Sequence, residues 1–322
     1  MTLSGRVLLI IAICFAGLAS AQSRYPDKPI RMVVPLAAGS AVDNAMRIVT
    51  ERMAENMGQA IAIENQPGAA GLIGAERVAK AAADGYTLGG FNDSIMTMLP
   101  NLYAKMPWDI LKDFEPVSLV ATVEWGLVTT SDSPYRTAAD LIAAAKASPG
   151  KINYGSGGNG SPQHVAMELF ASTAGISLTH VPYKGATQAA VGVAAGEVQV
   201  AFQGLATVTG LVKGGKLRLL AVTTTRRMLL FPEVPTVSES GLPGFEFNSW
   251  ATIVAPAGTP KQIVSFLNAE VVRALAAPDV RDKLLAQGLT PRGSTTEELA
   301  QATREQLVRY AGLMKQAGIK LE

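Results

Sequence analysis

The chain has 322 residues, of which 48% are hydrophobic and 17% are charged. This composition is typical of a globular protein and excludes a chain that is disordered throughout. The net charge of +2 excludes a strongly basic or acidic protein, so charge alone gives no indication of binding to nucleic acid or to an anionic membrane.

The first 21 residues have the pattern of a secretory signal peptide. Arg6 precedes the uncharged apolar run 7–18, and Ala19-Ser20-Ala21 follows as a small-residue cleavage site. The run is short for a membrane span, although an N-terminal anchor helix is the alternative. We therefore predict export and cleavage near Ala21. No later stretch reaches 18 uncharged apolar residues, so we expect no membrane span in the cleaved protein.

The only cysteine, Cys14, lies inside this leader. Ile13 directly precedes it, where a lipoprotein signal requires a small residue, so lipid attachment is not expected. The cleaved protein is therefore predicted to have no disulfide, no thiolate nucleophile and no cysteine metal ligand.

Strand and helix patterns alternate along the first third of the chain. A short β-rich run precedes a loop of small residues and an amphipathic helical pattern. A strand, a Pro-Gly turn, a helix and another strand follow. The predicted segments are strand 30–35, loop 37–43, helix 44–57, strand 60–63, turn 65–71, a helix to about 83, and strand 87–91.

The rest of the chain continues the alternation. A loop with Pro100 and Pro107 leads into an apolar stretch, and Pro162 after Ser161 marks a strong helix start. The predicted segments are the apolar stretch 117–130, helix 137–147, strand 151–154, loop 155–161, helix 162–174, β and α segments at 178–181, 187–195, 198–202 and 217–223, strand 250–255, and a helical end from 260 to about 314, broken near 278 and 288.

This order predicts an α/β architecture with parallel strands. The unit strand, small-residue loop, helix occurs twice, at 30–57 and at 151–174, which suggests two similar lobes. Ligands of open α/β sheets bind at the carboxyl ends of strands. We therefore expect one loop from each lobe to face a shared cleft.

Both loops should present unpaired backbone N–H groups at a helix N-terminus, where anions bind. Small side chains allow close approach to the backbone, and serine and asparagine add polar partners. One such loop alone is more often an ordinary turn, but two of the same kind favour a carboxylate site. The candidate ligand-binding residues are Ala37, Ala38, Gly39, Ser40, Asp43, Gly155, Ser156, Gly157, Asn159, Gly160, Ser161 and His164.

An enzyme, a secreted α/β hydrolase or reductase, is the main alternative. Residues 155–160 fit G-x-G-x-x-G, but the acidic residue of a dinucleotide site is missing from 180–184, and no P-loop lysine follows. Ser161, His164 and Glu168 share one helix, which rarely gives nucleophile and base geometry, and there is no G-x-S-x-G elbow. We therefore predict no catalysis and no cofactor, and expect His164 to hydrogen-bond near the cleft or to pack its helix.

Four further residue types need a role. With His164 and His180 as the only histidines, a histidine-rich metal site is excluded, and a carboxylate cation site has no support. Asp43 is expected to cap its helix rather than to contact the ligand. Lys184 either neutralises an anionic ligand or is solvated. Trp108 and Trp250 are expected to pack near inter-lobe crossings.

Taken in order, these motifs resemble the Bug-type (TctC-like) receptors of tripartite tricarboxylate transporters, a family of periplasmic binding proteins. The resemblance runs from about Tyr25 to the C-terminus. It is carried by 25–30, 35–43, 64–74, 84–88, 154–161 with His164 and Glu168, 180–185, 232–237, 241–245 and 255–260.

The resemblance implies a type II periplasmic binding fold, in which two α/β lobes joined by two crossing strands close on a carboxylate held by the two loops, partly through ordered water. It implies a third cleft contact at Ser94, and Gln203 is a further candidate ligand contact. The chain departs from the family at Leu36 and Ser40, where an aromatic residue and glycine are common. It also departs at Gln203, where many members carry an aspartate that meets a ligand amino group, so an amino-acid ligand is less expected.

The expectation is thus a periplasmic, monomeric receptor for a mono-, di- or aromatic carboxylate. Lobe 1 would comprise 22–124 and 251–322, and lobe 2 would comprise 125–250. The partner would be an inner-membrane tripartite transporter or a sensor protein. A docking module that senses no small molecule is a second alternative, and the identity of the acid and the roles of Lys184 and Gln203 stay open.

Overall fold

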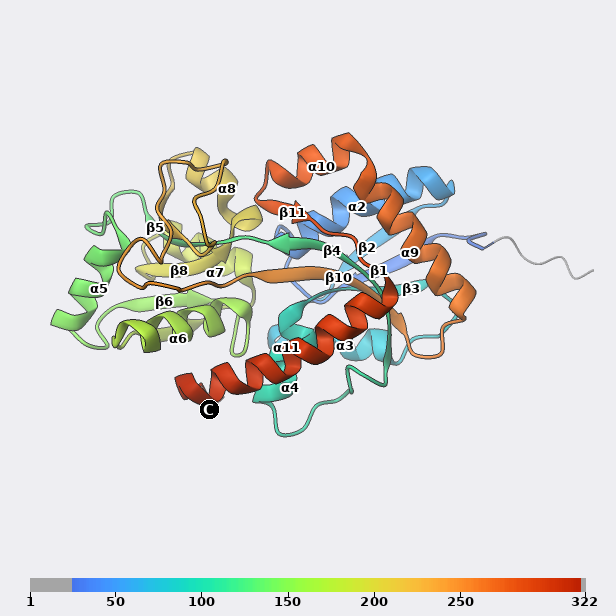
Figure 1. Ribbon diagram of the computed structural model, residues 1–322, viewed down its shortest axis with the longest axis horizontal. Helices are drawn as coiled ribbons and strands as arrows, with labels where there is room; N and C mark the ends of the chain where they lie inside the picture. The colour runs from blue at the N-terminus through green and yellow to red at the C-terminus, as the bar shows by residue number, and fades with distance from the viewer. Residues whose placement is uncertain (1–24, 320–322) are drawn as a thin grey trace, which may run out of the picture.

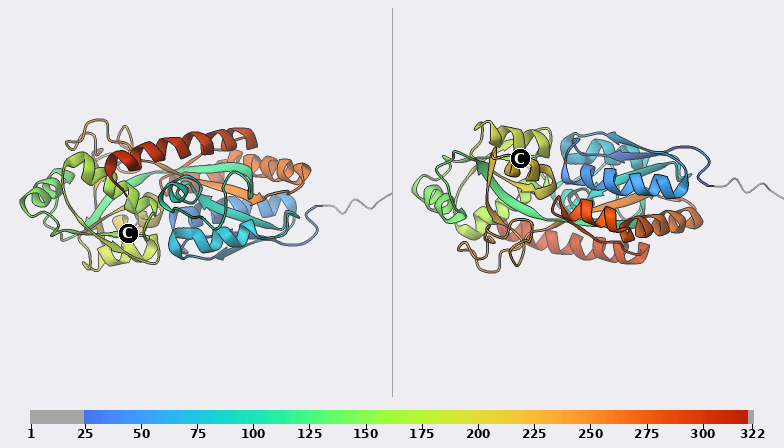
Figure 2. Two further views of the ribbon diagram at one scale, coloured as in Figure 1. Left: turned by 90° about the horizontal axis from the view of Figure 1, so that it is seen from below. Right: turned by 90° about the horizontal axis from the view of Figure 1, so that it is seen from above.

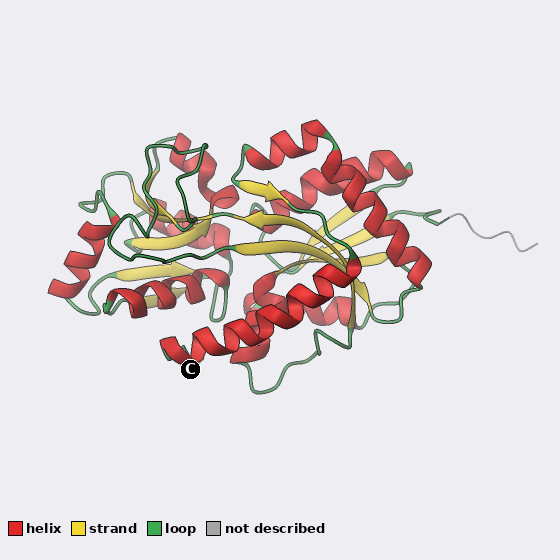
Figure 3. Ribbon diagram, in the orientation of Figure 1, coloured by secondary structure: helices red, strands yellow, loops and turns green. Residues whose placement is uncertain are grey.

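The computed structural model describes residues 25–319, so the predicted signal peptide lies outside the described residues. Within them, two β-sheets flanked by helices lie side by side along the longest axis of the molecule (Figures 1 and 3). We call the part built on the six-stranded sheet lobe 1 and the part built on the five-stranded sheet lobe 2. The predicted two-lobed α/β architecture is confirmed.

The sheet of lobe 1 has the strand order β11-β4-β10-β3-β1-β2. β1 pairs in parallel with β2 and β3, whereas β10 runs antiparallel to β3 and β4. The strands are β1 (Ile30–Val34), β2 (Ile61–Asn65), β3 (Thr87–Asn92), β4 (Phe114–Val123), β10 (Ser249–Pro256) and β11 (Leu289–Pro291).

The sheet of lobe 2 has the order β7-β6-β8-β5-β9, in which β6 pairs in parallel with β7 and β8. Its strands are β5 (Trp125–Thr130), β6 (Asn153–Ser156), β7 (Thr179–Pro182), β8 (Val200–Gly204) and β9 (Leu217–Val222).

Helices cover both sheets (Figure 3). Those of lobe 2 are α5 (Ala138–Ala147), α6 (Pro162–Ala174), α7 (Ala186–Ala194) and α8 (Leu205–Lys213). The others are α2 (Ala41–Met57), the 3-10 turn η2 (Ala69–Gly71), α3 (Leu72–Ala79), the π-helical turn η3 (Ser94–Met98), α4 (Leu99–Leu102), α9 (Lys261–Ala276), α10 (Pro278–Leu285) and α11 (Thr296–Ala317). None of the described helices is long and apolar enough to cross a membrane.

Two segments cross between the lobes next to each other. The apolar stretch 117–130 is two strands, because the chain leaves β4 at Val123 and enters β5 at Trp125 with only Glu124 between them. The return segment ends at the start of β10, where Ser249 pairs with Val123. The paired crossings form a two-segment connection between the lobes.

The helix after the first loop starts earlier than the pattern predicted. It begins at Ala41 because the hydroxyl of Ser40 accepts a hydrogen bond from the backbone of Asp43 at 3.3 Å. The prediction that Asp43 caps this helix is therefore wrong: Ser40 is the cap, and Asp43 is the third helical residue. Met46 and Met53 on its inner face are fully buried, and burial of each such side chain contributes about 1.5–3 kcal/mol.

The last helix, α11, belongs to both lobes. It packs on β4 and η3 of lobe 1 and on α6 of lobe 2, and both views of Figure 2 show it running from one lobe toward the other. Its buried residues include Tyr310 and Met314. Trp108 and Trp250 are buried in lobe 1, as expected for packing residues, and Trp250 lies on the crossing strand β10.

Candidate functional site

A cavity lies between the lobes and receives side chains from both. It encloses about 600 Å³ free of protein atoms, part of which is open to solvent. Its lining residues are Pro35, Leu36, Ala37, Ser40, Ala41, Val42, Pro67, Gly68, Ala70, Gly71, Asn92, Val123, Trp125, Gly157, Ser161, Pro162, Gln163, Lys184, Gly185, Ala186, Gly204, Thr207 and Ser249.

Among the described residues, five α-helices have their N-cap residue in the lining of this cavity: α2, α3, α6, α7 and α8. The lining residues at these starts are Ser40, Ala41, Gly71, Ser161, Pro162, Gly185, Ala186 and Gly204. Each helix start carries a partial positive charge. Lys184 is the only charged residue among the described lining residues, so the electrostatic environment is positive.

The inter-lobe connection forms an apolar part of the wall. Trp125, the first residue of β5, lines the cavity and donates a hydrogen bond from its indole Nε1 to Ser249 Oγ at 2.8 Å. Its ring packs edge-on against Phe247 at 5.4 Å between centroids. Sequence reasoning missed both Trp125 and Ser249, because only the pairing of the two crossing segments brings them together.

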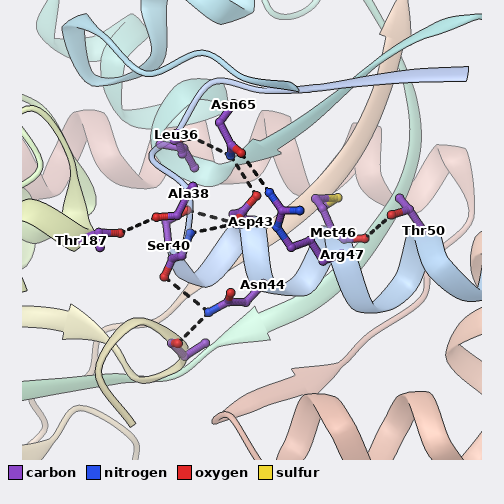
Figure 4. Close-up of polar contacts among 12 residues, drawn as sticks. Leu36, Ala38, Ser40, Asp43, Asn44, Met46, Arg47, Thr50, Asn65 and Thr187 are labelled. Carbon is purple, nitrogen blue, oxygen red and sulfur yellow. Dashed lines mark hydrogen bonds and ion pairs between the residues drawn. The ribbon is translucent and has the colours of Figure 1, made fainter. Parts of the chain in front are cut away.

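The first predicted loop is fixed by a residue that lies outside the cavity wall. Ala37 and Ser40 line the cavity, whereas Asp43 is 1% exposed and does not. Its Oδ2 accepts hydrogen bonds from Gly39 N at 2.8 Å and Arg47 Nε at 2.9 Å, and its Oδ1 accepts one from Asn65 Nδ2 at 2.9 Å (Figure 4). Asp43 therefore fixes the backbone of the loop at Gly39.

The second predicted loop repeats this design. Gly157 and Ser161 line the cavity, and Ser161 caps α6 by accepting a hydrogen bond from His164 N at 3.4 Å. The His164 Nδ1 accepts a hydrogen bond from Gly160 N at 3.2 Å, as Asp43 does from Gly39. Each loop thus has a glycine, a serine cap and, four residues after the glycine, an acceptor for the glycine N–H. Gly39 and Gly160 have φ of +75° and +79°, which favours glycine.

The remaining predicted members of this loop lie at its edges. Gly155 and Ser156 are the last residues of β6 and do not line the cavity. Asn159 lines a second hollow, together with Tyr103 and Tyr183, and this hollow shares Gly157 and Lys184 with the cavity.

A stack of three rings lies beneath the second loop. His180 is sandwiched between His164 at 4.3 Å and Tyr154 at 4.8 Å between centroids. Tyr154 donates a hydrogen bond to Glu168 at 2.5 Å, and His180 Nε2 bonds Ser156 Oγ at 2.5 Å. Burial lowers the pKa of His164 to about 4, and burial together with His164 lowers the pKa of His180 to about 4. Both rings are therefore neutral near pH 7.

The other two predicted contacts lie outside the cavity wall. Ser94 does not line the cavity; its hydroxyl donates a hydrogen bond to Gly160 O at 2.8 Å. Gln203, on β8 directly before the lining residue Gly204, is fully buried, and neither of its amide atoms has a partner within residues 25–319. The Thr207 Oγ is likewise buried without a partner in this range, and Thr207 lines the cavity.

The arrangement offers no centre for metal or nucleophilic chemistry in the described residues. Residues 25–319 contain no group of three histidine, cysteine or acidic side chains that could hold a metal ion. The Ser161 hydroxyl is used as a helix cap, and His164 faces Gly160 rather than Ser161 Oγ. Ser156 does bond a histidine, but it is fully buried. What the site presents is a set of polar backbone groups around a cavity that is partly open to solvent.

Residues 45–319 match the family described as the tripartite tricarboxylate transporter family receptor. The chain belongs to this family. Protein BugT of Bordetella pertussis (strain Tohama I) is 34% identical over 322 residues, which cover 98% of this chain and 99% of BugT.

Solved structures of similar proteins agree with this membership. Rpa4515 of R. palustris with adipate has a TM-score of 0.90 and 35% identity, covering 92% of this receptor chain and 99% of its own. MatC (Rpa3494) of Rhodopseudomonas palustris with bound malate has a TM-score of 0.85 and 31% identity, covering 90% and 99%. The fold is thus the periplasmic binding protein fold, and the predicted family resemblance is confirmed. Because the family is one of binding receptors, the enzyme alternative is not supported.

Proposed function

We propose that this receptor captures a small carboxylate in the periplasm and presents it to a tripartite transporter. The observation that carries the proposal is the convergence of five helix starts and Lys184 on a cavity whose described lining contains no acidic residue. Such a cavity favours an anion and disfavours a cation.

The backbone would supply most of the bonds to the ligand. No side chain caps α7 or α8, so N–H groups of their first turns are available at the cavity, except that of Leu205, which donates to Glu124 O at 2.8 Å. Hydrogen bonds to a charged group contribute about 1.5–3 kcal/mol each. We assign the ligand contacts to loops 37–40 and 157–161, with Lys184 as the nearby cation and the unpartnered Thr207 hydroxyl as a further donor.

The lining also limits the class of acid. Leu36, Val42, Val123 and Trp125 provide apolar walls, which suit a short carbon chain. Gln203 is neutral, and no acidic lining residue would meet an ammonium group, so a plain mono- or dicarboxylate fits better than an amino acid. Adipate and malate, which relatives bind, are the first candidates.

Location and partner follow from family membership and the predicted leader. The proposal places the cleaved chain in the periplasm as a monomer and gives it inner-membrane transporter subunits as partner, with a sensor protein as the alternative. Residues 22–124 with 251–322, and 125–250, are proposed to move as the two lobes.

The test is thermal unfolding of the cleaved protein, refolded to remove any carried ligand, against mono-, di-, tri- and aromatic carboxylates and amino acids. A ligand that binds only the folded state stabilises it by about 2.7 kcal/mol at 100 times its dissociation constant. We expect the midpoint to rise with one chemical class of acid.

The matched variants are Gly157→Val and Gly312→Val. A side chain at Gly157 would meet Ala186 N at 3.1 Å at the cavity wall, whereas one at Gly312 on α11 meets no atom within 4 Å. The ligand-dependent shift should vanish only in Gly157→Val. If no acid shifts the wild type, the carboxylate proposal fails and a docking module becomes the better interpretation.

A further inference from the structure

We propose that Ser94 and Thr187 are positioning residues, each of which fixes the binding loop of the opposite lobe when the lobes close. The inference rests on the proposed function only in taking loops 37–40 and 157–161 as the ligand-binding loops. The two hydrogen bonds join the lobes directly and need no ligand.

The first contact runs from lobe 1 to lobe 2. Ser94 is the first residue of η3, directly beyond the end of β3, and is fully buried. Its hydroxyl donates to Gly160 O at 2.8 Å. The N–H of Gly160 is already held by His164 of its own lobe. Lobe 2 therefore fixes one polar group of this glycine, and lobe 1 fixes the other.

The second contact runs in the opposite direction. Thr187, in the first turn of α7, donates its hydroxyl proton to Ala38 O at 2.8 Å (Figure 4). Ala38 O and Gly39 N belong to one peptide group, and Gly39 N is held by Asp43 of lobe 1. This peptide group is thus bound at its N–H by its own lobe and at its carbonyl by the other lobe.

A third hydrogen bond also joins the two lobes. Asn44 on α2 donates from Nδ2 to Ala206 O on α8 at 2.8 Å, and Figure 4 shows the side chain reaching away from its own helix. All three acceptors are backbone carbonyls, so the bonds depend on the position of the opposite backbone and on no ligand atom.

The lobes meet closely enough to make these bonds. A Cβ added to Gly204 would lie 3.0 Å from Ala41 Cβ and 2.9 Å from a methyl of Val123, and one added to Gly185 would lie 2.7 Å from Ala37 Cβ. Neither glycine has a left-handed φ, so alanine would fit the backbone of each. The steric clash of an added Cβ would therefore lie where α7 and α8 of lobe 2 meet α2 and its preceding loop.

The experiment measures lobe closure directly. Cysteines replace Ile73 on α3 and Val191 on α7, which are 59% and 56% exposed, and carry spin labels. The only natural cysteine, Cys14, is in the predicted leader, so labelling is specific in the cleaved protein. Electron–electron resonance then gives the inter-label distances without ligand and with adipate as the probe.

We expect a measurable closed population in the unliganded wild type. Ser94→Ala and Thr187→Val should each reduce the closed-to-open ratio by about 2- to 10-fold, the factor for one net hydrogen bond, and weaken adipate binding by a similar factor. Gly204→Ala should shift the ratio further toward open. Ser172→Ala and Thr173→Val, on α6 at exposed positions, are the matched controls and should change nothing.

Three results would overturn the inference. An unliganded wild type that is entirely open would show that the inter-lobe bonds do not hold the lobes. Unchanged distances and affinity in both variants would show that the hydroxyls have no positioning role. Weaker adipate binding with unchanged distances would show that they contact the ligand instead. Failure of adipate to bind the wild type would exclude adipate as the ligand and leave the unliganded comparison decisive.

Discussion

The buried histidine beneath the second loop predicts that the receptor loses stability in mild acid. His164 is 7% exposed, and burial lowers its pKa from 6.5 to about 4. Above pH 6.5 the ring is neutral in both folded and unfolded chains. Between pH 6.5 and 4 the unfolded chain binds a proton that the folded chain does not, so the free energy of unfolding falls as the pH falls.

The size of the effect follows from the two pKa values. A pH of 5 is 1.5 units below the pKa of 6.5 that His164 has in the unfolded chain. In the folded chain the ring is still mostly neutral at this pH. At 1.36 kcal/mol per unit, the loss relative to pH 7.5 is about 2 kcal/mol. His180 acts in the same direction, but it is partly exposed and faces Glu168, so the figure is for His164 alone. Protonation would also remove the Nδ1 acceptor that holds Gly160 N.

The test compares urea unfolding of the wild type and His164→Asn at pH 7.5, 6 and 5. Asparagine keeps an acceptor near Gly160 N but does not titrate, so its stability should fall by about 2 kcal/mol less than that of the wild type. Carboxylates elsewhere titrate equally in both proteins and cancel in the comparison. Equal losses in the two proteins would refute the assignment of this pH dependence to His164.

Two further substitutions test the parts that hold the site. Asp43→Ala removes the acceptor of Gly39 N and one of the two acceptors of Asn65 Nδ2, so we expect thermal unfolding to show a loss of about 1–3 kcal/mol, with Asp43→Asn losing less; equal losses would contradict this account of the loop. Ser249→Ala removes the acceptor of the Trp125 indole, which should cost about 1–3 kcal/mol and shift the fluorescence of that tryptophan; an unchanged midpoint would mean that water replaces the hydroxyl.

The sequence predicted well those features that depend on neighbouring residues. The two small-residue loops, the helix start at Pro162 and the α/β order all follow from local patterns, and the structure confirms them. Local ambiguity caused the error at the first helix, because Ser40 and Asp43 are both good capping residues and only the hydrogen bond at Ser40 distinguishes them. The run 117–130, predicted as one apolar stretch, is divided at Glu124 into β4 and β5.

The parts of the site that the sequence could not predict depend on distant contacts. Gly185 and Gly204 resemble ordinary turn residues until the strand order brings α7 and α8 to the cavity. Ser94 was expected to touch the ligand, but its acceptor, Gly160 O, lies 66 residues away in the chain. No periodicity or spacing encodes such a pairing, because it exists only once two separately folded sheets meet.

The matching design of the two loops favours an anion more strongly than either loop alone. Each loop needs an acceptor for the N–H of its left-handed glycine, but an uncompensated carboxylate there would repel a bound anion. In lobe 1 the acceptor is Asp43, whose charge is paired with Arg47 at 2.9 Å. In lobe 2 it is His164, which its low pKa of about 4 keeps neutral. Two chemically different side chains thus fix the same backbone geometry without adding net negative charge, and the positive helix starts remain available to the ligand.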